Sequence, residues 1–170
     1  MTHRNTENAA HLGEIRNVEI PPVGLPGILH VPPAPYGLVV FAHGSGSGRL
    51  SPRNTAVASA LNRHSFATLL FDLLTPSEEA DRANVFDIPL LANRLVDAVQ
   101  WLNGQPSIAK LSLGLFGAST GAAAALVAAA KIPHRIGAVV SRGGRPDLAG
   151  DALDRCCGRA WSSDLDRSRL

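Results

Sequence analysis

The amino-acid sequence predicts an α/β protein built on a doubly wound, mostly parallel sheet. A continuous apolar run at 37–42 and mainly apolar stretches at 67–71 and 136–140 are typical of strands that are buried on both faces. Between these runs the apolar residues recur at helical spacing, and strands that alternate with helices form a parallel sheet covered on both sides. With 170 residues, of which 45% are hydrophobic, the chain suffices for one domain with a sizeable core.

The composition divides the chain into three parts. Residues 1–16 read as a polar N-terminal tail, and residues 17–153 carry the α/β pattern. Residues 154–170 differ in kind, because they show no strand run and no clear helical face. We therefore predict a partial α/β domain over 17–153 and an atypical, disordered tail over 154–170.

Proline residues place the first two strands at the border of the sheet. Short apolar stretches at 18–20 and 28–31 have three prolines between them. Proline cannot donate a hydrogen bond to a neighbouring strand, so these stretches suit an edge hairpin rather than the sheet's centre. The run at 37–42 has no such breaks, and we predict it as a central strand.

Two helices and a further strand follow the central strand. Ser51 and Pro52 mark a helix start, with an N-cap residue followed by proline at the first helical position. The strand at 67–71 ends at Asp72, and a loop then leads to a second helix whose apolar residues recur over 91–102.

The stretch from 111 to 131, LSLGLFGASTGAAAALVAAAK, organises the rest of the chain. Its apolar start predicts a buried strand, and its alanine-rich end predicts a buried helix that lies close against a sheet. Between them, residues 117–121 fit the G-x-S-x-G motif, in which small residues allow a sharp turn from strand to helix and expose the serine. This context predicts Ser119 as a nucleophile.

Charge and cysteine content exclude several classes of protein. The net charge is +2 without a long run of Lys or Arg, so we expect no nucleic-acid or membrane partner and a small molecule instead. No signal-peptide pattern and no apolar run of membrane-spanning length occur, and we expect a cytoplasmic protein. The adjacent Cys156 and Cys157 offer neither a disulfide framework nor metal spacing, so we expect no metal and no cofactor.

Three loops that follow predicted strands meet at the edge where ligands bind in such sheets, around Ser45, Asp72 and Ser119. A serine nucleophile needs a base and backbone N–H groups that stabilise the oxyanion. We predict two such donors, the N–H of Thr120 at the helix start and the N–H of Ser45 in the glycine-rich loop.

Five segments carry a resemblance to a known family. In chain order they read FAHGSGSGR, SPRN, LLFDLLTP, FGASTGAAAAL and VVSRGGRPDLAG. Over roughly residues 14–153 the chain resembles the dienelactone-hydrolase-like branch of the α/β-hydrolase superfamily. The resemblance implies an eight-stranded sheet, Ser119 as the active-site residue, and hydrolysis of esters or lactones through an acyl-enzyme. Typical dienelactone hydrolases have cysteine at the position of Ser119, so their substrate is not carried over.

The acid and the histidine of the expected catalytic triad have no clear candidate. In this superfamily the order along the chain is Ser, then Asp or Glu, then His. Only His134 follows Ser119, and we place it in a loop at the amino-terminal edge of the sheet. We expect Asp147 in a loop or at a helix cap, whereas Asp72 precedes the nucleophile. His43 fits a role in shaping the oxyanion hole better than a role as base.

Residues 154–170 stand where the family would continue with further strands, the acid, the histidine and a final helix. We hypothesise that the reading frame changes near Asp154, or that the chain was truncated there and given an unrelated tail. The alternative is a natural variant whose tail is disordered. A fold without its last strands and helix leaves an uncovered sheet edge for self-association. Without a base, Ser119 is expected to be an impaired nucleophile.

Two other functions compete with hydrolysis. The glycines at 44, 46 and 48, with Asp72 after the next strand, are similar to a dinucleotide-binding pattern, but position 49 is arginine where G-x-G-x-x-G requires glycine. The second alternative is a non-catalytic remnant that binds a small ligand or a partner chain.

Overall fold

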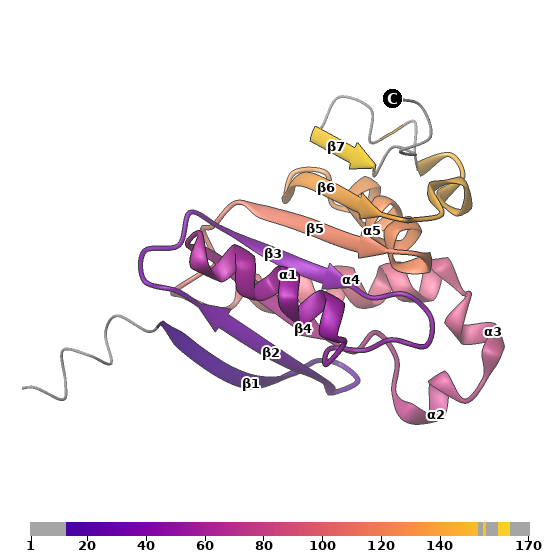
Figure 1. The fold of residues 1–170 in the computed structure, drawn as a ribbon. Helices are drawn as coiled ribbons and strands as arrows, with labels where there is room; N and C mark the ends of the chain where they lie inside the picture. Colours follow the sequence, from indigo (N-terminus) through magenta and orange to yellow (C-terminus); the bar gives the residue numbers. More distant parts are fainter. Residues whose placement is uncertain (1–12, 153–154, 156–159, 164–170) are drawn as a thin grey trace, which may run out of the picture.

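Seven strands among the described residues form one mixed sheet in the order β1-β2-β4-β3-β5-β6-β7 (Figure 1). The computed structural model describes residues 13–152, 155 and 160–163. The strands are β1 (Glu14–Ile20), β2 (Leu25–Val31), β3 (Gly37–Ala42), β4 (Phe66–Phe71), β5 (Leu113–Ala118), β6 (Ile136–Arg142) and β7 (Ala160–Ser163). The helices are α1 (Pro52–Arg63), α2 (Pro76–Glu79), α3 (Arg82–Val85), α4 (Ile88–Asn103), α5 (Thr120–Lys131) and the 3-10 helix η1 (Pro146–Ala149).

The pairing of the strands confirms the predicted doubly wound, mostly parallel sheet. Strands β4, β3, β5, β6 and β7 pair in parallel, and the β1–β2 hairpin joins β4 in the antiparallel sense. The hairpin lies at one border of the sheet, as its prolines predict. The parallel strands bring the carboxyl ends of β3, β4 and β5 to a single edge, which positions the loops that follow them.

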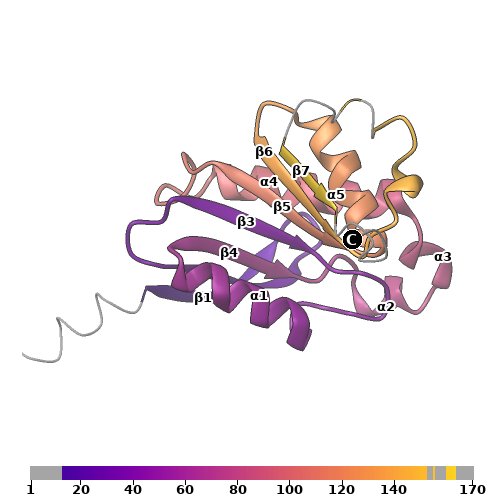
Figure 2. The same ribbon diagram turned by 45° about the horizontal axis from the view of Figure 1, so that its top comes forward.

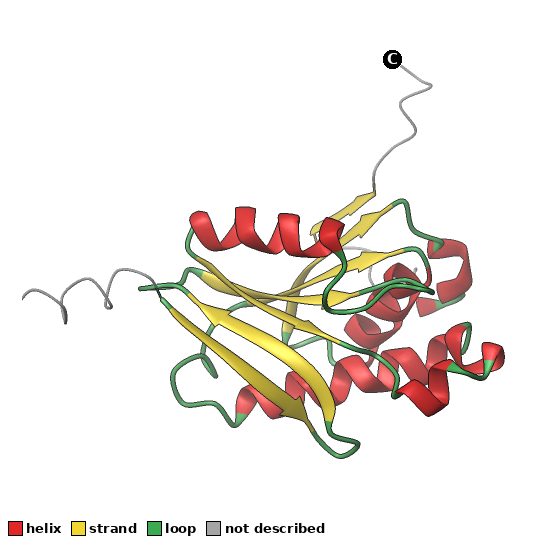
Figure 3. Cartoon of the chain, turned by 60° about the horizontal axis from the view of Figure 1, so that its bottom comes forward, coloured by secondary structure: helices red, strands yellow, loops and turns green. Residues whose placement is uncertain are grey.

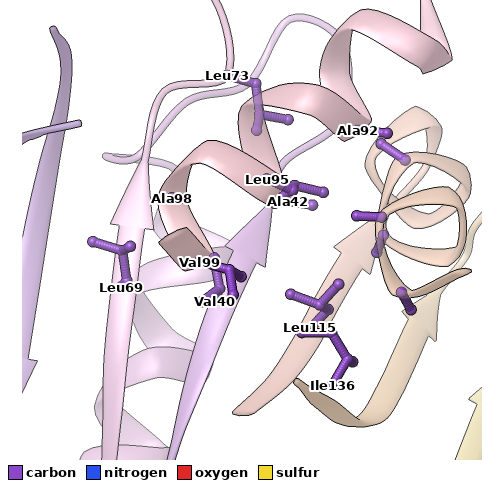
Figure 4. Close-up of a cluster of buried hydrophobic side chains, with 14 of the residues drawn as sticks. Val40, Ala42, Leu69, Leu73, Ala92, Leu95, Ala98, Val99, Leu115 and Ile136 are labelled. Atoms are coloured by element: carbon purple, nitrogen blue, oxygen red, sulfur yellow. The ribbon is translucent and has the colours of Figure 1, made fainter. Parts of the chain in front are cut away.

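Helices cover both faces of the sheet. Helix α1 packs against β4 on one face, while α4 and α5 pack against each other on the opposite face (Figures 2 and 3). The larger core lies between the sheet and these two helices, where Leu95 and Val99 of α4 approach Val40, Leu69 and Leu115 of the strands (Figure 4). Burial of such side chains contributes about 1.5–3 kcal/mol each, so this layer holds the edge with the loops in place.

On the α1 side, β5 and β6 line an apolar groove of about 440 Å³ that includes Phe116, Ala138 and Val140. Val140 is 39% exposed. Self-association through an uncovered sheet edge stays a prediction. The groove is a second apolar surface through which two copies of the chain could associate.

Three sequence expectations differ from the structure. Strand β1 begins at Glu14, within the predicted polar tail, because its polar side chains face solvent along an edge strand held by backbone pairing. The loop after Asp72 contains the short helices α2 and α3, whose first turns are capped by Thr75 and Asp81. Residues 160–163 form β7 beside β6, although no strand is expected after 153, because a parallel neighbour supplies the backbone partners.

The predicted disorder of the remaining tail lies outside the described residues, apart from Arg155. In the described part of the chain, no helix combines the length and apolarity needed to cross a membrane.

Candidate active site

Ser119 occupies a sharp turn between β5 and α5. Its backbone has φ 53° and ψ −125°, a conformation that costs a non-glycine residue about 1–3 kcal/mol. The residue is the N-cap of α5 without a capping hydrogen bond from its own side chain. The hydroxyl has no hydrogen-bond partner among the described residues, so the turn presents it rather than using it structurally.

The glycines of the motif allow this turn because each lies against main chain. A Cβ on Gly117 would overlap with Ala122 in the first turn of α5, and a Cβ on Gly121 would overlap with the carbonyl oxygen of Ala42 at the end of β3. Any larger residue would push α5 away from the sheet. The small residues of the sequence thus have a steric cause at both positions.

The glycine-rich loop after β3 touches the same turn. A Cβ on Gly44 would lie 2.8 Å from the Cβ of Ser119 and 3.0 Å from the carbonyl oxygen of Ala118. The close approach places Ser45, the next residue, beside the serine turn. Ser45 itself is exposed, and Thr120 is 3% exposed.

A third segment, the loop after β6, also attaches to Ser119. The carbonyl oxygen of Ser119 accepts the N–H of Ala122 at 3.1 Å and the N–H of Arg145 at 3.4 Å. The first bond belongs to the start of α5, and the second fixes the β6–η1 loop. Ser119 therefore lies where β5, α5 and the loop after β6 meet.

Both ring nitrogens of His43 have partners. Nε2 accepts the N–H of Leu73 at 3.0 Å, so this nitrogen carries no proton in that bond. Nδ1 is then the protonated nitrogen and donates to the carbonyl oxygen of Gly44 at 3.0 Å. His43 thus connects the glycine-rich loop to the end of β4, and neither nitrogen is free to take a proton from Ser119.

Asp72 holds the other end of the same loop. Its Oδ1 accepts the backbone N–H of Arg49 at 2.7 Å, and its Oδ2 forms an ion pair with the Arg49 guanidinium. The carboxylate is therefore engaged through both oxygens. In a dinucleotide-binding site this carboxylate would accept hydrogen bonds from the ribose. Here Arg49 already occupies both of its oxygens.

These loops border a cleft of about 740 Å³ at the carboxyl edge of the sheet. Ser45, Asp72 and Thr120 all line it, so the structure brings together the three loops that the sequence places at this edge. A further wall of the cleft comes from Leu74, the α2–α3 segment and α4. Most of the lining side chains of that wall are apolar.

Thr120 lines the cleft and leaves one polar atom unsatisfied. Its Oγ1 is buried and has no hydrogen-bond partner among the described residues. Unpaired buried hydroxyls are rare in proteins and cost about 1–3 kcal/mol. The backbone N–H of Thr120 opens α5, where the helix dipole favours negative charge.

Two titratable candidates remain, His134 and Asp147. His134 is exposed between α5 and β6, at the amino-terminal edge of the sheet, as expected. Asp147 lies in the first turn of η1 and is paired with Arg145 at 2.7 Å. The hydrogen bond from Arg145 lowers the pKa of Asp147. Asp147 therefore belongs to a short helix at the surface and is held there in an ion pair.

Sequence reasoning missed two parts of this site. Arg49 is the partner of Asp72, and a separation of 23 residues gives no local signal for that pair. The α2–α3 wall of the cleft does have a signal, since Thr75 and Glu78 form a reciprocal capping box.

Comparison with known proteins bears on the family and the fold. No family model matches the chain. The crystal structure of a dienelactone hydrolase from Anabaena variabilis is 52% identical, with a TM-score of 0.80, and the match covers 85% of this chain and 70% of that one. Est1E from Butyrivibrio proteoclasticus, at 18% identity and TM-score 0.63 over 78% of this chain and 51% of that one, shows the same fold.

A curated protein of Mycobacterium tuberculosis strain H37Rv, named "Putative phosphoribosyl transferase Rv0571c", is 65% identical over 132 residues. The match takes in 78% of this chain, which spans about 30% of the length of the curated relatives it matches. Because a dienelactone hydrolase at 52% identity is matched over 70% of its length, the family follows directly: the chain belongs to the dienelactone-hydrolase-like family of α/β hydrolases.

Proposed function

We propose that the cleft is a serine-hydrolase site in which Ser119 attacks an ester or lactone carbonyl and forms an acyl-enzyme. The observation that carries this proposal is the Ser119 turn. Its positive φ and its place between a buried strand and a buried helix support an exposed oxygen nucleophile, directly before Thr120, which lines the cleft.

Two backbone donors support the same proposal. The N–H of Thr120 stands at the start of α5, where it favours the negative charge that develops on the carbonyl oxygen. The N–H of Ser45 follows Gly44, whose close approach to Ser119 brings the two loops together. An oxyanion between these two N–H groups would lie at the carboxyl edge of the sheet.

The proton from Ser119 has no acceptor among the described residues. His43 is the histidine that lines the cleft in that part of the chain, and both of its nitrogens are engaged. We therefore propose that turnover by this chain is impaired. The loss of triad members costs on the order of a millionfold in kcat, and the remaining rate comes from binding and the oxyanion donors.

A second candidate function is the binding of a small ligand without turnover. The engaged nitrogens of His43 favour it, since the cleft of about 740 Å³ persists without a base. Phosphoribosyl transfer, the activity in the name of the mycobacterial relatives, has weaker support. The match to this chain covers only 30% of the length of each relative, so the named activity can belong to the part of the relative that this chain does not match. A phosphoribosyl donor that raises the melting temperature would favour that activity.

Covalent labelling tests the proposal. A fluorophosphonate is expected to modify wild-type protein slowly on the peptide that contains Ser119, as detected by mass spectrometry, and to leave Ser119→Ala unmodified. Ser107→Ala is the control, because Ser107 is an exposed serine between α4 and β5 outside the cleft lining, and its replacement is expected to leave labelling unchanged. Labelling that persists in Ser119→Ala would contradict the assignment of the nucleophile.

Ester hydrolysis tests the impairment separately. With a p-nitrophenyl ester, a rate typical of an intact serine hydrolase that disappears in Ser119→Ala would show that a base is present.

A cytoplasmic location and the absence of a nucleic-acid partner remain predictions, checked by fractionation and by a DNA-binding assay. Self-association is checked by light scattering over a range of protein concentrations.

A further inference from the structure

The glycine-rich loop is fastened at both ends to the residues that follow β4. At its start, His43 accepts the N–H of Leu73 at 3.0 Å. At its end, Asp72 accepts the N–H of Arg49 at 2.7 Å. Asp72 and Leu73 are neighbours, so two adjacent residues hold the 44–48 loop. Its five residues are all glycine or serine and have few conformational restraints of their own.

The Asp72 carboxylate makes two different bonds to one residue. One oxygen accepts the Arg49 backbone N–H, and the other pairs with the Arg49 guanidinium. The first bond fixes the path of the main chain, while the second fixes the orientation of the carboxylate. The side chains of Arg49 and Asp72 are 31% and 23% exposed, so the pair is partly shielded from water.

The contact extends to the glycines. A Cβ on Gly48 would lie 2.9 Å from Oδ1 of Asp72, so the loop passes directly over the carboxylate. The next turn is closed by the N–H of Ser51, which donates to the carbonyl oxygen of Gly48 at 3.0 Å. The loop is thus tied to Asp72 immediately before α1 begins.

We propose that Asp72 is a positioning residue that, through Arg49, holds the 44–48 loop in the conformation that presents the Ser45 N–H to an oxyanion formed at Ser119. The proposal rests on the proposed function, because it assigns a purpose to the loop only if Ser119 forms a tetrahedral adduct. Electrostatic stabilisation depends on donors that are fixed before the reaction, and glycines alone do not fix them.

Phenylboronic acid is the probe, because its adduct requires the same donors and no catalytic turnover. The Ser119 oxygen forms a bond to the trigonal boron, the hydroxyl proton passes to solvent, and boron becomes a tetrahedral anion. One boron-bound oxygen then takes the position of an oxyanion. The readouts are the dissociation constant, the ¹¹B signal of tetrahedral boron and the shift of the Ser45 amide in a ¹H–¹⁵N spectrum.

The variants separate the two bonds of Asp72. Asp72→Asn keeps an oxygen that can accept the Arg49 backbone N–H but loses the ion pair. Arg49→Met likewise keeps the backbone bond to Asp72 and loses only the ion pair. Asp72→Ala loses both bonds. Asp72→Ala is expected to bind the boronate most weakly, with a dissociation constant raised by at least about tenfold. Loss of a whole oxyanion donor costs roughly a hundredfold or more, and this variant displaces the donor without removing it. Asp72→Asn and Arg49→Met are expected to show a smaller, similar loss.

The double variant Arg49→Met/Asp72→Asn is expected to bind no worse than either single variant, because both remove one interaction. In all of these variants the Ser45 amide shift on adduct formation is expected to shrink along with affinity. A role limited to stability would lower the melting temperature and leave that shift intact. The control is Asp147→Asn, which removes an exposed ion pair with Arg145 at the same edge and is expected to leave binding unchanged.

The outcomes distinguish the two proposals. If wild-type protein and Ser119→Ala bind boronate equally, the proposed function is wrong. If wild-type protein forms the Ser119 adduct while Asp72→Ala binds equally well with the full Ser45 shift, the function stands and the positioning role is refuted. Should Asp72→Ala fail to fold, Asp72→Asn and Arg49→Met decide the question in the same way.

Discussion

Gly121 packs directly against the carbonyl oxygen of Ala42, with no room for a side chain between α5 and the end of β3. A Cβ at this position would also lie 2.5 Å from the carbonyl oxygen of His43. The last glycine of the G-x-S-x-G motif therefore sets how closely the serine-bearing helix approaches the glycine-rich loop.

Gly121→Ala is expected to destabilise the protein by about 3 kcal/mol or more, at the upper end of overpacking, because main chain cannot move aside as a side chain can. Urea unfolding measures the effect. Gly137→Ala in β6 is the control, since its new Cβ would lie 3.6 Å from the nearest atom, the carbonyl oxygen of Leu113, which is an ordinary contact. Equal losses in the two variants would refute the steric explanation.

Ser119→Gly is expected to raise the free energy of unfolding by about 1 kcal/mol, because glycine adopts a positive φ without strain. Ser119→Ala removes the same hydroxyl and keeps the strained backbone, so it is expected to leave stability unchanged. Both variants are expected to lose fluorophosphonate labelling. Equal stabilities of the two variants in thermal unfolding would show that the turn stores no strain.

Thr120→Val is expected to stabilise the protein by about 1 kcal/mol, because it removes an unpaired buried hydroxyl and keeps the shape of the side chain. Thr120→Ser keeps the hydroxyl and serves as the matched variant, with no such gain. Denaturant midpoints measure both. A loss of stability in Thr120→Val would instead show that the hydroxyl is hydrogen-bonded.

Glu78 makes the stability of the α2 region depend on pH. The N–H of Thr75 is the main cause that lowers the pKa of Glu78 below its ordinary value of 4.5, with Arg94 contributing and burial opposing. A folded-state pKa below the unfolded value means that the stabilisation is complete above about 4.5 and is lost as pH falls through the folded pKa.

Glu78→Gln can keep the capping bond to Thr75 but does not titrate. The difference in unfolding free energy between wild type and this variant is therefore expected to be largest near neutral pH and to shrink as the solution is acidified below about 4.5. A difference that stays constant across this range would contradict the assigned role of the carboxylate.

The local elements of the fold were predictable because their causes lie within a few residues. The apolar run of β3 predicts a buried strand, and the small residues around Ser119 predict the turn before α5. The edge position of the β1–β2 hairpin follows from prolines. Its start at Glu14 was missed, because backbone pairing along an edge strand leaves no apolar alternation in the sequence.

The sequence by itself determined the central strands β3 to β6, the helices α1, α4 and α5, and the serine turn, since hydrophobic period and residue size act locally. The tertiary structure alone decided that His43 bonds to Leu73, that Asp72 holds Arg49, and that 160–163 pair with β6. These contacts join segments that are brought together only when parallel strands align at one edge. The physical reason is distance along the chain, because no local pattern records which polar groups will meet after folding.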